Sequence, residues 1–124
     1  GVDLSAGENQ LFGTNTVDKR HFTAFSMTHN TAANAEIADD ETIKIMNPLN
    51  YIGKPGVNLP QNWRIRVGTN DRDTSLAVSA VLAAKLQNNG QTVDYALPWD
   101  VGHGGDYDLD ELFAWMKQVS SAAK

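Results

Sequence analysis

Two loops in the second half of the sequence carry side chains whose types and spacing could support acid–base chemistry. The first loop, Gly68–Thr74, contains Asp71 and Asp73, and the second, Pro98–Asp106, contains His103. A carboxylate that accepts a hydrogen bond from one imidazole nitrogen fixes the tautomer of the ring and leaves the other nitrogen free as a general base. Asp71 and His103 are therefore a candidate acid–base pair, provided that the fold brings the two loops together.

Each of these residues also has a structural explanation. An aspartate that follows a strand is most often a turn former or a helix N-cap, and Asp73 or Thr74 could cap the next helix. A single histidine is more often structural than catalytic. His103 lies between glycines, where the backbone can turn tightly and leave room for a substrate. The other two histidines, His21 and His29, are expected to be structural or exposed.

The elements that must position these loops are predicted from the apolar periodicity of residues 63–119. The pattern predicts strands at Trp63–Gly68 and Thr92–Leu97 and helices at Ser75–Asn89, with apolar Val78, Val81, Leu82 and Leu86, and at Asp108–Val119. A helix between two strands implies a right-handed crossover and a parallel strand pair. Both loops then leave the same edge of the sheet, where functional residues of α/β proteins collect.

The first half of the sequence is less regular. Residues 1–17 indicate a loop, Val17–His29 and Glu41–Met46 are predicted as helices, and the prolines and glycines of residues 48–62 indicate an irregular connection. Parallel sheets normally contain more than two strands and are covered on both faces. Two strands and four helices do not close such a sheet. The fold class is therefore α/β, but as part of a larger architecture.

The start of the final predicted helix is marked by an acidic cluster. Asp108 as the N-cap with Glu111 three residues later resembles a capping box, and Tyr107 could pack on Leu112. The cluster lacks the central glycine and the ligand spacing of a calcium loop. Capping therefore explains these residues better than a metal site does, and we expect neither a metal nor a cofactor.

Composition excludes several classes of protein. The chain has 124 residues, of which 41% are hydrophobic, with 15 acidic and 10 basic side chains and a formal net charge of −5. This length suits a single domain of about 100–150 residues, and the acidic balance without a lysine or arginine run argues against a nucleic-acid surface. No apolar stretch approaches the roughly 20 residues of a membrane helix. There are no cysteines and hence no thiolate chemistry.

The order of the candidate residues along the chain matches a catalytic triad from which one residue is missing. In α/β-hydrolases the triad runs serine, acid, histidine, and the serine lies in a Gly-x-Ser-x-Gly turn between a strand and a helix. Asp71 and His103 follow that order, but no serine of this chain lies in such a turn. The chain also begins Gly-Val-Asp, without methionine or a signal-peptide pattern. We therefore expect it to be a piece of a longer protein.

Several segments resemble the C-terminal region of bacterial tannases, in the tannase and feruloyl-esterase branch of the α/β-hydrolases. The similarity is strongest in WRIRVGTNDRDTS (residues 63–75), VDYALPWDVGHGGDYD (93–108) and LFAWM (112–116). It extends more weakly to GENQLFG (7–13) and DKRHFT (18–23). Gly-x-x-Asp and Gly-His are general to α/β-hydrolases, whereas Asp-x-Asp-Thr-Ser and His-x-Gly-Asp-Tyr are more specific to this branch.

The resemblance implies roles for four residues. Asp71 matches the triad acid, His103 the triad base, and Asp73 the carboxylate that binds the hydroxyls of a galloyl ring. Glu8 matches a second carboxylate of that subsite. The serine and the oxyanion hole would come from a partner chain or an N-terminal segment.

The resemblance also implies an organisation and a function for the whole chain. Residues 1–124 would be the C-terminal segment of one α/β-hydrolase domain, with 1–62 as a helical and loop region on the substrate side. Residues 63–124 would be its final strand-helix-strand-helix unit. The expected function is hydrolysis of galloyl-type esters, and the expected location is extracellular or periplasmic. The alternatives are a feruloyl or general carboxylesterase and a non-catalytic α/β binding or assembly domain.

Overall fold

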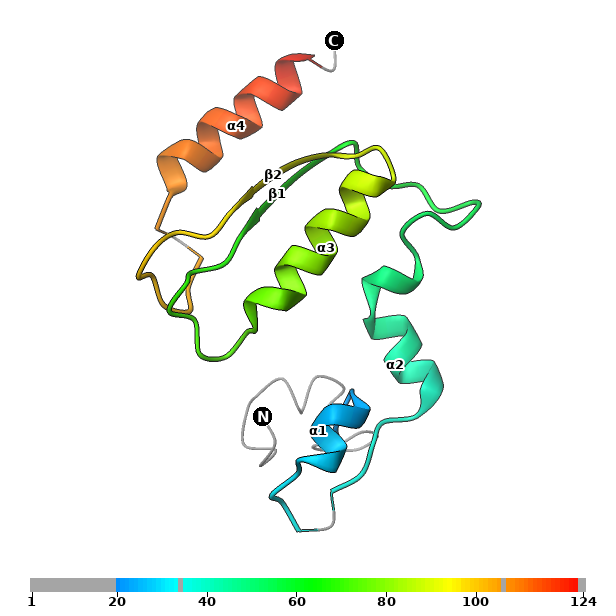
Figure 1. Ribbon diagram of the computed structural model, residues 1–124. Helices are drawn as coiled ribbons and strands as arrows, with labels where there is room; N and C mark the ends of the chain where they lie inside the picture. The colour runs from blue at the N-terminus through cyan, green and yellow to red at the C-terminus, as the bar shows by residue number, and fades with distance from the viewer. Residues whose placement is uncertain (1–19, 34, 106, 123–124) are drawn as a thin grey trace. The chain divides into compact units, whose positions relative to one another are not determined.

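A computed structural model describes residues 20–33, 35–105 and 107–122 of the chain (Figure 1). Backbone contacts divide the chain into two compact units, Gly1–Asn50 and Tyr51–Lys124. Each unit is described by itself, and the single-domain organisation expected from the sequence stays a prediction. None of the described helices is both long enough and apolar enough to cross a membrane.

The first unit contains two short helices with side-chain caps at their starts. In α1 (Ala24–Thr28) the hydroxyl of Thr23 accepts a hydrogen bond from the Ser26 amide at 3.0 Å. In α2 (Asp40–Met46) Asp39 accepts one from the Thr42 amide at 2.9 Å, and a single turn of 3₁₀ helix, η2 (Pro48–Asn50), follows. α2 begins at Asp40, one residue before its predicted start at Glu41, because Asp39 is the cap.

The predicted helix Val17–His29 is wrong over residues 20–23, the first part of it that the structure describes. Among residues 20–29 only Ala24–Thr28 are helical, and His21 instead forms a parallel bridge with Ile37. The His21 amide donates to the Glu36 carbonyl at 2.9 Å, and the Ala38 amide donates to the His21 carbonyl at 2.8 Å. This pairing with a distant segment removes residue 21 from the helix and buries its side chain.

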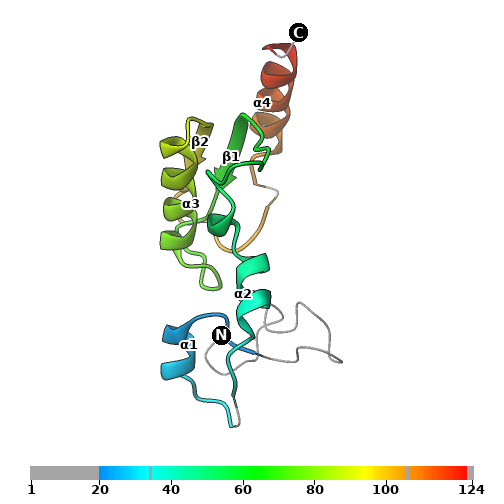
Figure 2. The same cartoon turned by 90° about the vertical axis from the view of Figure 1, so that its right-hand side faces the viewer.

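The second unit is built on a pair of parallel strands, as the sequence predicts. β1 (Asn62–Arg66) and β2 (Thr92–Ala96) pair in register from Asn62 opposite Thr92 to Arg66 opposite Ala96. The crossover between them is α3 (Leu76–Asn88), and α4 (Leu109–Ala122) follows β2. The strand pair lies between α3 and α4 (Figures 1 and 2). Both strands end before their predicted last residues.

α3 packs on one face of the strand pair through small and apolar side chains. Ser79, Ala83 and Leu86, which share one side of the helix, are buried, and Leu86 is the most completely buried. The Ser79 hydroxyl lies 3.1 Å from the hydroxyl of Tyr95 on β2. Val78 and Val81, by contrast, are more than half exposed. The helix is therefore apolar on two sides, of which the strands cover only one.

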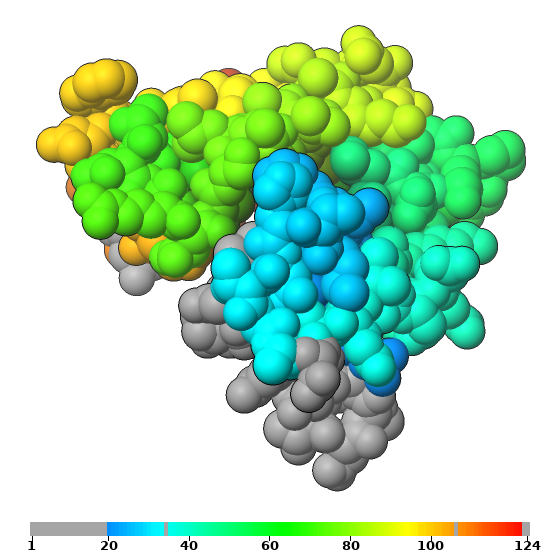
Figure 3. Space-filling model, turned by 60° about the horizontal axis from the view of Figure 1, so that its bottom comes forward, coloured from blue at the N-terminus to red at the C-terminus, as the bar shows by residue number. Residues whose placement is uncertain are grey.

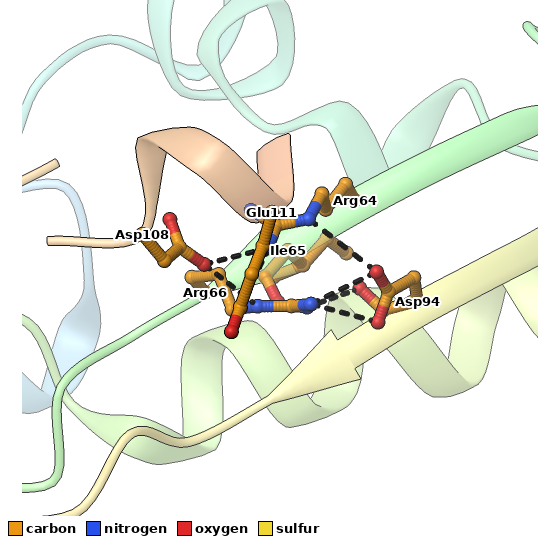
Figure 4. Close-up of polar contacts among 6 residues, drawn as sticks. All are labelled: Arg64, Ile65, Arg66, Asp94, Asp108 and Glu111. Carbon is orange, nitrogen blue, oxygen red and sulfur yellow. Dashed lines mark hydrogen bonds and ion pairs between the residues drawn. The ribbon is translucent and has the colours of Figure 1, made fainter. Parts of the chain in front are cut away.

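The opposite face of the strands carries an ion-pair network, the arginine cluster (Figure 4). It consists of Arg64, Arg66, Asp94, Asp108 and Glu111. Arg66 donates to both carboxylate oxygens of Asp94, at 2.9 and 2.8 Å, and so connects β1 to β2. Arg64, whose side chain is only 6% exposed, donates to Asp108 at 2.6 Å. Its Nε lies 3.4 Å from Asp94, close enough for ion pairing but without hydrogen-bond geometry.

The arginine cluster changes the role that the sequence suggests for Asp108. The residue does precede α4, and its carbonyl accepts the first helical hydrogen bond, from the Leu112 amide at 3.0 Å. Its carboxylate, however, pairs with Arg64 and lies 3.3 Å from Arg66, and the Glu111 carboxylate lies 3.6 Å from Arg64. The first turn of α4 is thus attached to β1 by charge, because two arginines outcompete backbone amides for the carboxylates.

Acid should selectively remove the contribution of Asp108 to stability. The hydrogen bond from Arg64 holds the pKa of Asp108 below its ordinary value of 3.8. Ionised Asp108 therefore stabilises the folded chain above that value, and the contribution is lost as pH falls through the folded-state pKa. Asp108→Asn should lower the unfolding temperature near neutral pH. The difference in unfolding temperature between this variant and the wild type should disappear below about pH 4. Thermal unfolding across pH checks this. Asp110→Asn, which changes an exposed carboxylate in the same turn, is the control, and a gap that persists in acid would contradict the assignment.

Candidate active site

The loops after β1 and β2 continue the pairing of the two strands beyond their ends. The Val67 amide donates to the Ala96 carbonyl at 3.4 Å, and the Thr69 amide donates to the Pro98 carbonyl at 2.9 Å. The next amide, that of Asn70, donates to the Val101 carbonyl at 2.9 Å. In Figure 3 the segment after β1, in green, and the segment after β2, in yellow to orange, lie side by side. The backbone therefore brings the two loops together.

Gly68 permits this close approach. It is buried, and a Cβ atom built on it would collide with the Val101 carbonyl and would lie 2.7 Å from the carbonyl oxygen of Gly102. Any side chain here would push the loop after β2 away. The glycines that flank His103 have open space around them instead. Within the described part of this loop, the left-handed backbone conformation is adopted by Asp100, with φ 56°.

Asp71 and His103 are hydrogen-bonded to each other, as the strand order predicts. Nδ1 of His103 lies 3.1 Å from Oδ2 of Asp71, whose side chain is 7% exposed, whereas that of His103 is 56% exposed. The other carboxylate oxygen, Oδ1, accepts hydrogen bonds from the Asp73 amide at 2.8 Å and the Thr74 amide at 3.0 Å. Both oxygens of Asp71 therefore have partners within the chain.

The electrostatics of Asp71 determine the state of the imidazole. The Thr74 amide, followed by the Asp73 amide and His103, lowers the pKa of Asp71, so the carboxyl is ionised at neutral pH. An ionised carboxylate only accepts hydrogen bonds, so the proton of neutral His103 must be on Nδ1. Nε2 then carries the lone pair of the ring, which is the tautomer that a general base needs.

Asp73 lies beside this pair but has a different environment. Its carboxylate is 67% exposed and lies 4.0 Å from Nδ1 of His103. The alternative in which Asp73 or Thr74 caps the next helix is wrong, because Ser75 is the cap of α3 and accepts from the Ala77 amide at 3.3 Å. The carboxylate of Asp73 can thus face a ligand. Glu8, the other predicted substrate-binding residue, lies outside the described residues.

One ligand atom from each of Asp71, Asp73 and His103 could face a common cation. These atoms lie within 4.8 Å of one another, and carboxylate oxygen with imidazole nitrogen is a donor set that divalent metals accept. In the structure, however, Nδ1 of His103 and Oδ2 of Asp71 are bonded to each other. A metal would have to replace that proton, so the geometry favours acid–base chemistry.

Comparison with known proteins identifies a class of enzyme that shares this segment. No protein-family model and no curated protein matches the chain. Among solved structures, the matches include tannases, also called tannin acyl hydrolases, at 45–46% sequence identity. The resemblance predicted from the sequence is therefore confirmed.

Three of these structures illustrate the match. A tannase from Lactobacillus plantarum is 45% identical over 96% of this chain, with a TM-score of 0.78. A tannin acyl hydrolase in complex with ethyl gallate is 46% identical over 95% of this chain, with a TM-score of 0.76. The tannase of Fusobacterium nucleatum is 46% identical over 96%, with a TM-score of 0.74. The chain spans only 25%, 25% and 26% of these three proteins.

The arginine cluster and Thr69 support the site but were missed by the sequence reasoning. A signal for the cluster was available, because the alternation in Trp63–Val67 places Arg64 and Arg66 on one face of a strand. Two positive charges on a covered face require carboxylate partners. Nothing in the local sequence around Thr69 marks its contact with the loop after β2.

Asp71→Asn should reverse the tautomer of His103. The amide oxygen of asparagine can still accept from the Asp73 and Thr74 amides, but its NH₂ group would face Nδ1. Nδ1 must then accept, so the imidazole proton moves to Nε2, the nitrogen that a general base needs free. The ¹⁵N chemical shifts of the imidazole nitrogens report the tautomer, and loss of signals in His103→Gln assigns them. An unchanged Nδ1–H tautomer in Asp71→Asn would contradict the assigned hydrogen bond.

Proposed function

We propose that this chain supplies the acid and the base of a serine esterase that hydrolyses aromatic, galloyl-type esters. The observation that carries the proposal is the Asp71–His103 hydrogen bond of 3.1 Å, formed through Nδ1 and Oδ2. This bond places the imidazole proton on Nδ1 and the lone pair on Nε2, the atom that would take the proton of a nucleophile. The similarity to tannases supports the substrate class.

In this proposal His103 acts first as a general base and then as a general acid. Nε2 takes the proton of a serine hydroxyl as the serine oxygen attacks the ester carbonyl, and ionised Asp71 stabilises the imidazolium that forms. The imidazolium then protonates the leaving alcohol, and an acyl-enzyme remains. Water, deprotonated by His103 in the same way, attacks the acyl-enzyme, and the imidazolium returns the proton to the serine oxygen as the aromatic acid leaves. The steps need no group beyond these side chains, the serine and donors for the oxyanion.

Asp73 would provide specificity for phenolic substrates. Its exposed carboxylate, 4.0 Å from the ring of His103, can accept hydrogen bonds from two neighbouring phenolic hydroxyls. Hydrogen bonds to a charged acceptor are about twice as strong as neutral ones. Matching structures carry ethyl gallate and 3,4-dihydroxybenzoate, which both present adjacent hydroxyls. Glu8 would be a second carboxylate of the same subsite.

The serine would belong to the part of a tannase-like protein that this chain does not contain. The chain spans about a quarter of the tannases it matches and has no Gly-x-Ser-x-Gly turn. In addition, large apolar side chains are exposed on both helices that flank the strands: Val78 and Val81 on α3, and Leu109, Phe113 and Met116 on α4. Apolar surface of this kind marks an interaction site. We propose that the remaining segment or partner chain covers it.

The serine and the histidine can be tested separately in the assembled enzyme. A fluorophosphonate probe should label the segment or chain outside these 124 residues. His103→Gln should reduce ester hydrolysis by about 10³-fold or more, since removal of one triad member removes most of the catalysis. His29→Gln, a change of another exposed histidine, should leave the rate unchanged. Full activity in His103→Gln would refute the proposal and favour a binding or assembly domain, whereas a probe label on this chain would refute the assignment of the serine to another segment or chain.

Substrate specificity is tested through Asp73. In Asp73→Asn, kcat/KM for methyl gallate should fall by about 10- to 100-fold, the range for loss of hydrogen bonds to a charged group. The rate with a short alkyl ester should remain within about twofold, because such a substrate has no phenol. Asp110→Asn, an exposed carboxylate on α4, serves as the control. An unchanged gallate rate in Asp73→Asn would favour a feruloyl or general carboxylesterase of the same fold.

A further inference from the structure

The loops that carry Asp71 and His103 are joined by side-chain hydrogen bonds in addition to their backbone pairing. The hydroxyl oxygen of Thr69 accepts from the Asp100 amide at 2.7 Å, the shortest of the bonds described between these loops. The Asn70 amide group adds a longer contact, at 3.4 Å, to the Asp100 carboxylate. Thr69 precedes Asp71 by two positions, and Asp100 precedes His103 by three.

Asp100 needs this support because of its backbone conformation. Its φ of 56° places it in the left-handed region, which is disfavoured for residues that carry a Cβ atom, although less for aspartate than for most. The side chain of Asp100 is exposed, so burial does not fix the residue. The bond from its amide to Thr69 is formed in the same turn that reverses the chain after Trp99. Loss of that bond would allow the turn to relax to a more common conformation.

A relaxed turn would move His103. Between Asp100 and His103 the described contact with the neighbouring loop is the Asn70 amide to the Val101 carbonyl, at 2.9 Å. The carbonyls of Val101 and Gly102 also pack against Gly68. His103 follows directly, so its imidazole, which is more than half exposed, moves with the backbone of this loop relative to Asp71.

We infer that Thr69 is a positioning residue whose hydroxyl oxygen fixes the turn at Asp100 and thereby aligns His103 with Asp71. Thr69 does not touch the reacting atoms and acts through the loop. The catalytic consequence rests on the proposed function, whereas the effect on the His103–Asp71 contact does not.

Three variants separate the effect of the Thr69 hydroxyl from the effect of its side-chain shape: Thr69→Val, Thr69→Ser and Thr92→Val. Valine keeps the branched shape of threonine and removes the acceptor, and serine keeps the acceptor. Thr92 is an exposed threonine at the opposite end of the strand pair, so Thr92→Val controls for the general effect of the substitution. Two readouts are made on the chain itself: hydrogen exchange of the Asp100 amide, and the His103 tautomer from imidazole ¹⁵N shifts.

The expected results differ between the variants. In Thr69→Val the Asp100 amide should exchange about 2 to 10 times faster, the range for loss of one net hydrogen bond, and the Nδ1–H tautomer of His103 should decrease. Thr69→Ser should restore both readouts, and Thr92→Val should change neither. In the assembled enzyme, kcat should fall by about 10- to 100-fold in Thr69→Val with little change in KM.

Two outcomes would overturn the inference. One is an Asp100 amide that exchanges in the wild type as fast as an unstructured peptide, a result that does not depend on whether Thr69→Val folds. The other is an unaltered His103 tautomer in folded Thr69→Val. Failure of the assembled enzyme to hydrolyse any ester would refute the proposed function, while both readouts on the chain would still decide the role of Thr69.

Discussion

The parallel pairing of β1 with β2 is the constraint on which the rest of the second unit depends. The strands start and end in register, with Arg66 opposite Ala96, so both loops leave the sheet at the same edge. Their amides and carbonyls go on pairing, from Thr69 with Pro98 to Asn70 with Val101. These backbone hydrogen bonds, which end one residue before Asp71, hold the two loops side by side. The acid–base pair is therefore a consequence of the ladder.

The two faces of this strand pair are attached to their helices by different forces. α3 packs through small and apolar side chains, with Leu86 completely buried. α4 is connected through the arginine cluster, where Arg64 and Arg66 meet carboxylates of β2 and of the first helical turn. Charge fixes the beginning of α4, while its apolar residues Leu109, Phe113 and Met116 remain exposed. Exposed apolar side chains on both helices thus accompany a chain that spans about a quarter of the tannases it matches.

Asp71 shows that a structural and a functional role need not exclude each other. One carboxylate oxygen accepts the Asp73 and Thr74 amides and shapes the turn before α3, which is the common role of such an aspartate. The other oxygen faces His103. The amides that form the turn also lower the pKa of the carboxyl, so the turn itself keeps Asp71 ionised for the histidine.

The amino-acid sequence by itself determined the order of elements in the second half, the parallel strand pair and the meeting of Asp71 with His103. These follow from periodicity and from the handedness of the crossover, which act over short stretches of chain. The tertiary structure alone decided that His21 leaves its predicted helix to pair with Ile37, and that Asp108 binds Arg64, 44 positions away. It also decided which atoms join Asp71 to His103 and that Thr69 bonds to Asp100. Such contacts require polar atoms from distant positions to meet within a few tenths of an ångström, and no local pattern of residue types encodes that distance.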